Sequence, residues 1–120
     1  MNAMSEFPRA LTAIERGALE LLLSVDRPGV SEYREQLREA VVTSRCPCGC
    51  LEFSVEVAEG SPSASSPGLA SAWSEDQQVH LELETHDGRL AGVVLMWFGD
   101  DEFRITPDLT TFEVSAGSAA

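Results

Sequence analysis

Residues 78–98, QVHLELETHDGRLAGVVLMWF, constrain the fold more than any other stretch of the chain. Up to position 86, apolar or Thr side chains alternate with Glu and His, which is the pattern of a strand with one buried face. Asp87-Gly88 is a preferred two-residue turn between antiparallel strands, and it pairs His86 with Arg89. The stretch therefore predicts a β-hairpin inside an antiparallel sheet.

The second strand of this hairpin is apolar on both faces. The residues that join the inner face are Leu90, Gly92, Val94 and Met96. The outer face then carries an apolar row made of Val93, Leu95 and Trp97. An apolar row on the outer face must be covered by something, and the N-terminal helices, the long loop or a second subunit could do so. We favour a protein partner or a second copy of the chain as the cover.

Helices are predicted before the strands. Thr12 and Glu15 form the pattern of a capping box at the start of one helix, which ends before Pro28. Residues 30–41 have apolar side chains at helical spacing and predict a second amphipathic helix. Residues 51–57, LEFSVEV, alternate and predict another half-buried strand. Because helices and strands are segregated along the chain, the expected fold class is α+β, with two N-terminal helices packed on an antiparallel sheet of three to five strands.

The chain is expected to form a single domain over residues 1–120, because its length is typical of one domain. Residues 59–76 are rich in Ser, Pro, Gly and Ala, and this composition predicts a flexible loop. After a turn at Pro107 we expect a last short strand. Residues 115–120, SAGSAA, are expected to be a disordered tail.

The charge balance excludes several partners. The chain has 20 carboxylates and 8 cations, all of them arginine, so its net charge is −12. An acidic surface repels phosphate groups, and we therefore expect no binding to nucleic acid. No apolar run approaches the roughly 20 residues of a membrane span, and the first residues lack a signal-peptide pattern. We expect a cytoplasmic protein that does not contact membranes.

All three cysteines lie in RCPCGC, between two predicted strands, and we expect them at the tip of a hairpin. Three thiolates suit zinc, which takes four ligands. If the strands at 51–57 and 79–86 pair antiparallel, the end of the second strand lies beside the start of the first. This pairing predicts a zinc site, with zinc as the cofactor, formed by Cys46, Cys48, Cys50 and His86.

Two other interpretations of the cysteines remain open. A cysteine without modification behaves as a small apolar residue, so the three thiols can be structural. The alternative is a redox site or a nucleophile, which would need a cation such as Arg45 or a nearby histidine to favour the thiolate form. The segment also resembles the opening of the zinc-binding SEC-C motif, but the ligand pair that follows in that motif is missing here.

Three segments taken together resemble a family of small uncharacterised actinobacterial proteins. They are LTAIERGALELLLSVDRPGVSEYREQL, then RCPCGC, then HDGRLAGVVLMWFGDDEF. The resemblance implies a start with two helices, a cysteine segment and a Gly-Arg-Leu strand. The family has no established activity, so the resemblance supports the architecture and no mechanism.

These patterns favour a small acidic cytosolic protein that acts as a non-enzymatic protein-interaction domain. A structural zinc site at the cysteine segment is compatible with this interpretation. The alternative is a small thiol-based enzyme or redox sensor centred on Cys46, Cys48 and Cys50.

Overall fold

A computed structural model of the chain describes residues 6–26, 28–47, 50–58, 60–64, 70–99 and 107–115. Within these ranges the helices are α1 (Ala13–Leu22), α2 (Val30–Leu37) and a short 3-10 helix, η1 (Leu109–Thr111). The strands are β1 (Arg9–Ala10), β2 (Val41–Arg45), β3 (Phe53–Glu56), β4 (Ser71–Ser74), β5 (Val79–His86), β6 (Arg89–Trp97) and β7 (Glu113–Ser115). The expected α+β class is confirmed, but the sheet has seven strands, not three to five.

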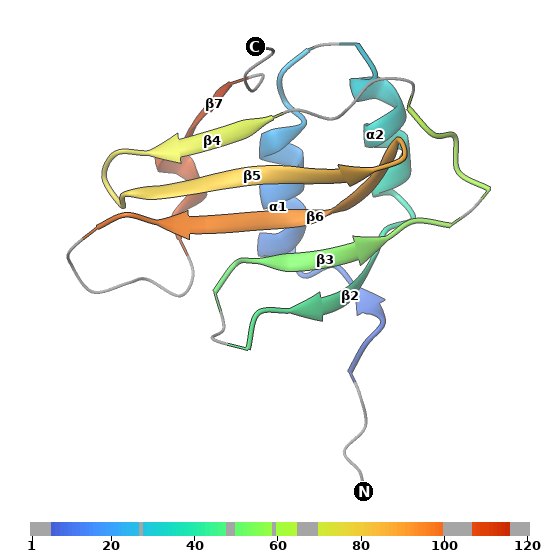
Figure 1. The fold of residues 1–120 in the computed structure, drawn as a ribbon, viewed down its shortest axis with the longest axis horizontal. Coiled ribbons are helices and arrows are strands. Elements are labelled where there is room, and N and C mark those ends of the chain that lie inside the picture. The colour runs from blue at the N-terminus through green and yellow to red at the C-terminus, as the bar shows by residue number, and fades with distance from the viewer. Residues whose placement is uncertain are drawn as a thin grey trace, which may run out of the picture.

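The strands form one antiparallel sheet in the order β1-β2-β3-β6-β5-β4-β7. Both α-helices lie behind the sheet in Figure 1, with α1 against β4, β5 and β7 and α2 against β6. The helices therefore cover one face of the sheet, and the core fills the layer between. Its largest fully buried apolar side chains are Tyr33, Leu19, Leu22, Leu51, Leu81, Val42, Val79 and Val93.

Helix α1 begins at the predicted capping box. The Oγ1 of Thr12 accepts a hydrogen bond from the amide of Glu15 at 3.3 Å, and Oε1 of Glu15 accepts one from the amide of Thr12 at 2.9 Å. These bonds satisfy two amides at the helix start that have no partner within the helix. Helix α2 is shorter than predicted, because it ends at Leu37 and β2 begins at Val41.

A buried glutamine joins three parts of the fold. The side chain of Gln36 on α2 is fully buried. Its Nε2 donates to the carbonyls of Pro62 and Gly88, both at 2.8 Å, and its Oε1 accepts from the amide of Leu90 at 2.9 Å. The amide group is thus satisfied at both ends, which a buried polar group requires. It fixes the β5–β6 turn against α2 and against the segment that precedes β4.

The β5–β6 hairpin has the predicted turn and an unpredicted bulge. Asp87 and Gly88 have φ angles of 52° and 77°, as the tight turn requires, and His86 pairs with Arg89. The register then shifts, so that Glu84 lies opposite Gly92. One extra residue on β6 changes the face on which every later side chain of that strand lies.

Parts of the chain that were expected to be loop or tail form strands. Residues 71–74 lie in β4, so the prediction of a loop throughout 59–76 is wrong there. Residues 59 and 65–69 lie outside the described part of the chain, as do residues 116–120 of the predicted tail. Ser115 ends β7, which is the last short strand that the sequence predicted.

Candidate functional site

One face of the sheet, here called the open face, is turned away from the helices. Side chains alternate between the two faces along a strand, and those directly opposite on neighbouring strands share a face. Ala72 and Leu81 pair with each other and are buried in the helix layer. Their neighbours therefore lie on the open face. One row across that face consists of Glu113, Trp73, His80 and Met96, and the next of Ser115, Ser71, Glu82 and Val94.

The open face carries an apolar cluster that we call the open-face patch, formed by Trp73, Val94, Met96 and Phe98. Phe98 is 60% exposed, an unusual amount for a large apolar side chain. The rings of Trp73 and Phe98 lie edge to face, with centroids 5.9 Å apart and an interplanar angle of 61°. This is a favourable aromatic geometry, so the two rings form one continuous surface.

Hydrogen bonds hold Trp73 in place. Its Nε1 donates to Oε1 of Glu75 at 3.0 Å, and the side chain of Gln78 donates to the carbonyl of Glu75 at 2.8 Å. Phe98 is also tied to this turn, because its amide donates to the carbonyl of Gln78 at 2.8 Å. The aromatic pair is therefore oriented before anything binds to it, which lowers the entropy that binding costs.

Exposed carboxylates surround the open-face patch. They belong to Glu75, Asp76, Glu82, Glu84 and Glu113. Glu113 is the register partner of Trp73, and Glu82 is the register partner of Val94. Negative charge therefore lies on β5, between the two strands that carry the patch, and on β7, next to Trp73.

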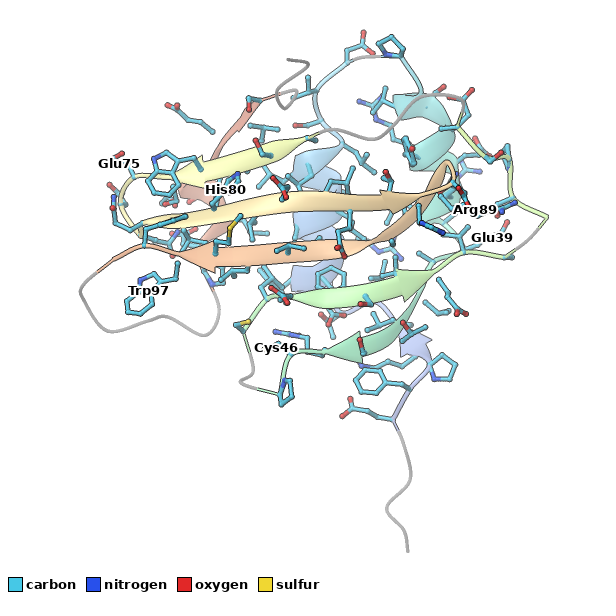
Figure 2. The ribbon with its side chains drawn as sticks, in the orientation of Figure 1. Glu39, Cys46, Glu75, His80, Arg89 and Trp97 are labelled. Atoms are coloured by element: carbon cyan, nitrogen blue, oxygen red, sulfur yellow. The ribbon has the colours of Figure 1, made fainter. Side chains whose placement is uncertain are left out.

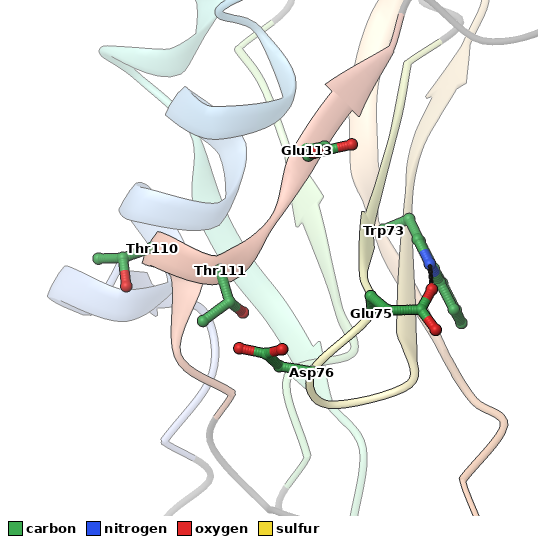
Figure 3. A pocket seen from close by; sticks show the side chains of 6 residues that line it. All are labelled: Trp73, Glu75, Asp76, Thr110, Thr111 and Glu113. Atoms are coloured by element: carbon green, nitrogen blue, oxygen red, sulfur yellow. Dashed lines mark hydrogen bonds between the residues drawn. The ribbon is translucent and has the colours of Figure 1, made fainter.

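A pocket opens beside Trp73, between the turn that follows β4 and the η1–β7 segment (Figure 3). It is lined by Trp73, Glu75, Asp76, Thr110, Thr111 and Glu113, and its volume is about 470 Å³. The hydroxyl of Thr111 lies 2.7 Å from that of Ser74 and accepts from Nε2 of Gln77 at 2.6 Å. These bonds fix one wall of the pocket. The lining combines an indole ring, carboxylates and hydroxyls, which suits a cationic or hydrogen-bonding group.

The predicted interaction row of Val93, Leu95 and Trp97 lies on the face of the sheet that the helices cover, and not on the outer face as predicted. Val93 is fully buried, since it pairs with the core residues Phe53 and Leu83. Leu95 is partly buried against the core, and Trp97, at the end of β6, is 40% exposed. The bulge before Gly92 is the physical reason, because it exchanges the two faces of β6. Val94 and Met96, predicted for the inner face, are the residues on the open face.

The cysteine segment does join two paired strands. β2 and β3 are antiparallel neighbours, and the amide of Cys46 donates to the carbonyl of Glu52 at 2.9 Å. Cys50 is buried, and its carbonyl accepts from Nε of Arg45 at 2.7 Å. Cys48 lies outside the described residues. In the described ranges, no three His, Cys, Asp or Glu side chains gather closely enough to hold a metal ion.

His86 does not lie beside the cysteines. The expected pairing of β3 with β5 is wrong, because β6 lies between them. β3 and β6 are antiparallel, so the start of β3, near Cys50, lies beside the end of β6 that pairs with His80. His86 pairs with Arg89 at the opposite end of β6. Figure 2 shows Cys46 and Arg89 well apart along the sheet. The His86 ring is largely exposed, with Nε2 3.3 Å from Oδ2 of Asp87.

An ion network around the buried Glu15 is joined to the cysteine segment through Arg45. Both carboxylate oxygens of Glu15 accept from Arg9, at 2.8 and 2.9 Å, and Oε2 also accepts from Arg45 at 2.9 Å. Burial alone would raise the pKa of Glu15. Hydrogen bonds from Arg9 and the Thr12 amide, with the charge of Arg9, outweigh burial and lower that pKa to about 2. Glu15 is therefore an anion at neutral pH that ties β1, α1 and β2 together.

Comparisons with models of known protein families, with curated proteins and with solved structures find no match to this chain. The resemblance to small actinobacterial proteins stays a prediction. Among the residues that the structure describes, no helix is long and apolar enough to cross a membrane.

Sequence reasoning missed the residues of the open-face patch for two separate reasons. Trp73 lies in a segment whose composition indicates a loop, and β4 is too short to show a clear alternation. Val94 and Met96 were assigned to the core because the alternation was carried past Gly92 unchanged. A glycine inside a strand often marks a bulge, and this was the one signal that could have found them.

Proposed function

We propose that this chain is a non-enzymatic protein-binding domain and that the open face of its sheet is the binding surface. The observation that carries the proposal is that, among the described residues, both helices pack on the same face of the sheet and leave the other face uncovered. Both helices lie on one face, while the other face presents a fixed Trp73–Phe98 pair with Val94 and Met96 beside it.

Physical arguments support this use of the open face. An antiparallel sheet can leave one face in water, but such a face normally carries polar side chains. Here aromatic and apolar side chains on β4, on β6 and after β6 share the face with His80 and Glu82 on β5, which lies between those strands. A surface that mixes aromatic and apolar side chains with charged ones suits a protein interface. Tryptophan and other aromatic residues are also enriched at the centres of interfaces.

A site-specific photocrosslink tests the proposal. The substitution Phe98→p-benzoylphenylalanine introduces a photoreactive group and keeps an aromatic ring on the open face. The substitution Glu20→p-benzoylphenylalanine places the same group on the exposed side of α1 and serves as a matched control. Irradiation in the cells that produce the protein is expected to give one discrete adduct from position 98 and none from position 20. Introducing Val94→Asp in the same chain should abolish the adduct, because a buried carboxylate in the interface costs free energy.

The protein found in the adduct must then bind the purified wild-type chain and not the Val94→Asp variant, with the melting temperature of both measured to show that they fold. Adducts of equal yield from both positions contradict the proposal. The absence of any adduct from position 98 contradicts it as well.

A structural zinc site is a second candidate feature, favoured by the β2–β3 pairing that brings Cys46 and Cys50 to one connection. Elemental analysis of protein purified without chelator is expected to find about one zinc per chain. Cys46→Ser should lower this content, whereas His86→Ala should leave it unchanged because His86 lies at the other end of the sheet.

If elemental analysis found no zinc in the protein, the proposed metal site would be wrong. The alternative of a thiol enzyme at Cys46, Cys48 and Cys50 would then remain to be tested. In that case alkylation faster than that of free cysteine at neutral pH would support a reactive thiol.

A further inference from the structure

We infer that the open face binds a basic segment of a different protein, with apolar side chains of that segment on the open-face patch and arginine or lysine side chains over the surrounding carboxylates. The inference rests on the proposed function and names the chemistry of the partner.

The charges of the face select a basic partner. Five exposed carboxylates lie on β5, between the strands of the patch, and next to the patch on β7 and in the turn after β4: Glu75, Asp76, Glu82, Glu84 and Glu113. Among the described residues of this face, Arg89 is the one arginine, and it lies at the hairpin end of β6, away from Trp73. A surface with one sign of charge accelerates and favours binding of the opposite sign.

The same charges disfavour a second copy of the chain. A two-fold contact places the same surface patch on both subunits, so the carboxylates of one copy would face those of the other. The whole chain has a net charge of −12 and contains no lysine. Like charges facing one another across an interface suppress binding, so the apolar patch does not by itself make a stable dimer.

The pocket beside Trp73 gives a basic side chain a defined place. Glu75 is oriented by its bonds to Trp73 and Gln78. Asp76 and Glu113 line the pocket, and their carboxylates accept no hydrogen bond from any described residue. A guanidinium or ammonium group there can contact the indole face and a carboxylate together, which is a favourable combination.

The test selects peptides from a displayed library of random twelve-residue sequences, with wild type and with a Met96→Ser/Phe98→Ser patch variant as targets. Enriched peptides are synthesised, and their affinity is measured by fluorescence anisotropy.

Two charge variants of the protein, which have equal net charge, are then compared for their affinity for these peptides. Glu82→Gln/Glu113→Gln removes carboxylates from the open face, whereas Glu20→Gln/Glu39→Gln removes two exposed ones elsewhere.

We expect peptides that depend on the patch to combine apolar residues with arginine or lysine. Their affinity should fall about 3- to 10-fold in the open-face charge variant and less than about 2-fold in the control, and it should weaken with salt. Replacing arginine in a peptide by citrulline, which is neutral and nearly isosteric, should weaken binding by a similar factor.

Other outcomes overturn the inference and separate it from the proposed function. Patch-dependent binding of neutral or acidic peptides, or equal binding of the citrulline peptides, refutes the basic partner and leaves the binding face standing. Self-association that Phe98→Ser abolishes, measured by light scattering, points to a second copy. If no peptide depends on the patch and position 98 gives no crosslink, both are wrong.

Discussion

Glu15 shows how one residue can serve both local and tertiary structure. Its side chain closes the capping box with Thr12, and the same carboxylate binds Arg9 and Arg45 from two neighbouring strands. The capping box could be predicted, because Thr12 and Glu15 have a fixed spacing in the sequence. The two arginines could not, because their approach to Glu15 depends on how β1 and β2 pair with each other and lie against the helix.

The pKa of Glu15 predicts an acid-sensitive part of the stability. Its folded-state pKa is about 2 against an ordinary value of 4.5, so the unfolded chain takes up the proton first as pH falls. The stabilisation is complete above about pH 5 and is lost progressively down to about pH 2; it amounts to roughly 3 kcal/mol. Glu15→Gln should lower the free energy of unfolding at pH 7 by about 3 kcal/mol, since Arg9 and Arg45 lose their anion.

Urea denaturation at pH 7 and pH 3 measures this effect. The free energies of unfolding of wild type and Glu15→Gln should be closer at pH 3 than at pH 7. The exposed Glu20→Gln variant serves as a control and should follow wild type at both values. If the free energies of unfolding of wild type and Glu15→Gln differed by the same amount at both pH values, the arginine partners would not be lowering the pKa of Glu15.

At the scale of elements, the bulge in β6 decides which side chains reach the open face. Gly92 has a φ of 150°, and a Cβ atom there would lie 2.3 Å from the carbonyl oxygen of Phe53 on β3. Glycine is therefore required both for the backbone conformation and for the close approach of the two strands.

Gly92→Ala is expected to lower the free energy of unfolding by about 2–4 kcal/mol, because β3 and β6 must separate or the bulge must move. Gly60→Ala is the matched control, since a Cβ atom at Gly60 meets nothing within 4 Å. It should change the stability by less than about 1 kcal/mol. Chemical denaturation at neutral pH checks both values, and equal stability of the two variants would contradict the role assigned to Gly92.

Local sequence signals predicted the β5–β6 turn, but they did not predict which strands far apart in the sequence pair with each other. Asp87-Gly88 carries its turn preference in two adjacent residues, and the turn forms as expected. β3 pairs with β6 and not with β5, which follows it among the predicted strands, and nothing near β3 in the sequence encodes this choice. The zinc site that included His86 depended on that pairing and was misplaced for the same reason.

At the scale of the whole molecule, segregation of helices and strands along the chain was enough to predict the α+β class. It could not predict β1, because a strand of two residues has too short a pattern to be seen. The short strand expected after Pro107 forms as β7, but its place at the opposite edge, beside β4, depends on a non-local pairing. The overall layering, with helices on one face, is what leaves the open-face patch uncovered. The proposed function is thus a property of the assembled sheet more than of any one motif.

The strand order also has a mechanical consequence. β1 and β7, nearest to the two ends of the chain, form opposite edges of the sheet, so all six strand pairings lie between them. Tension applied through the ends is carried by these pairings in series. The β1–β2 and β3–β6 ladders have two residue pairs each and the β4–β7 ladder has three, so these three ladders are the weakest and separate first. The β4–β5 and β5–β6 ladders, with four and eight residue pairs, carry the open-face patch and would keep their shape longest.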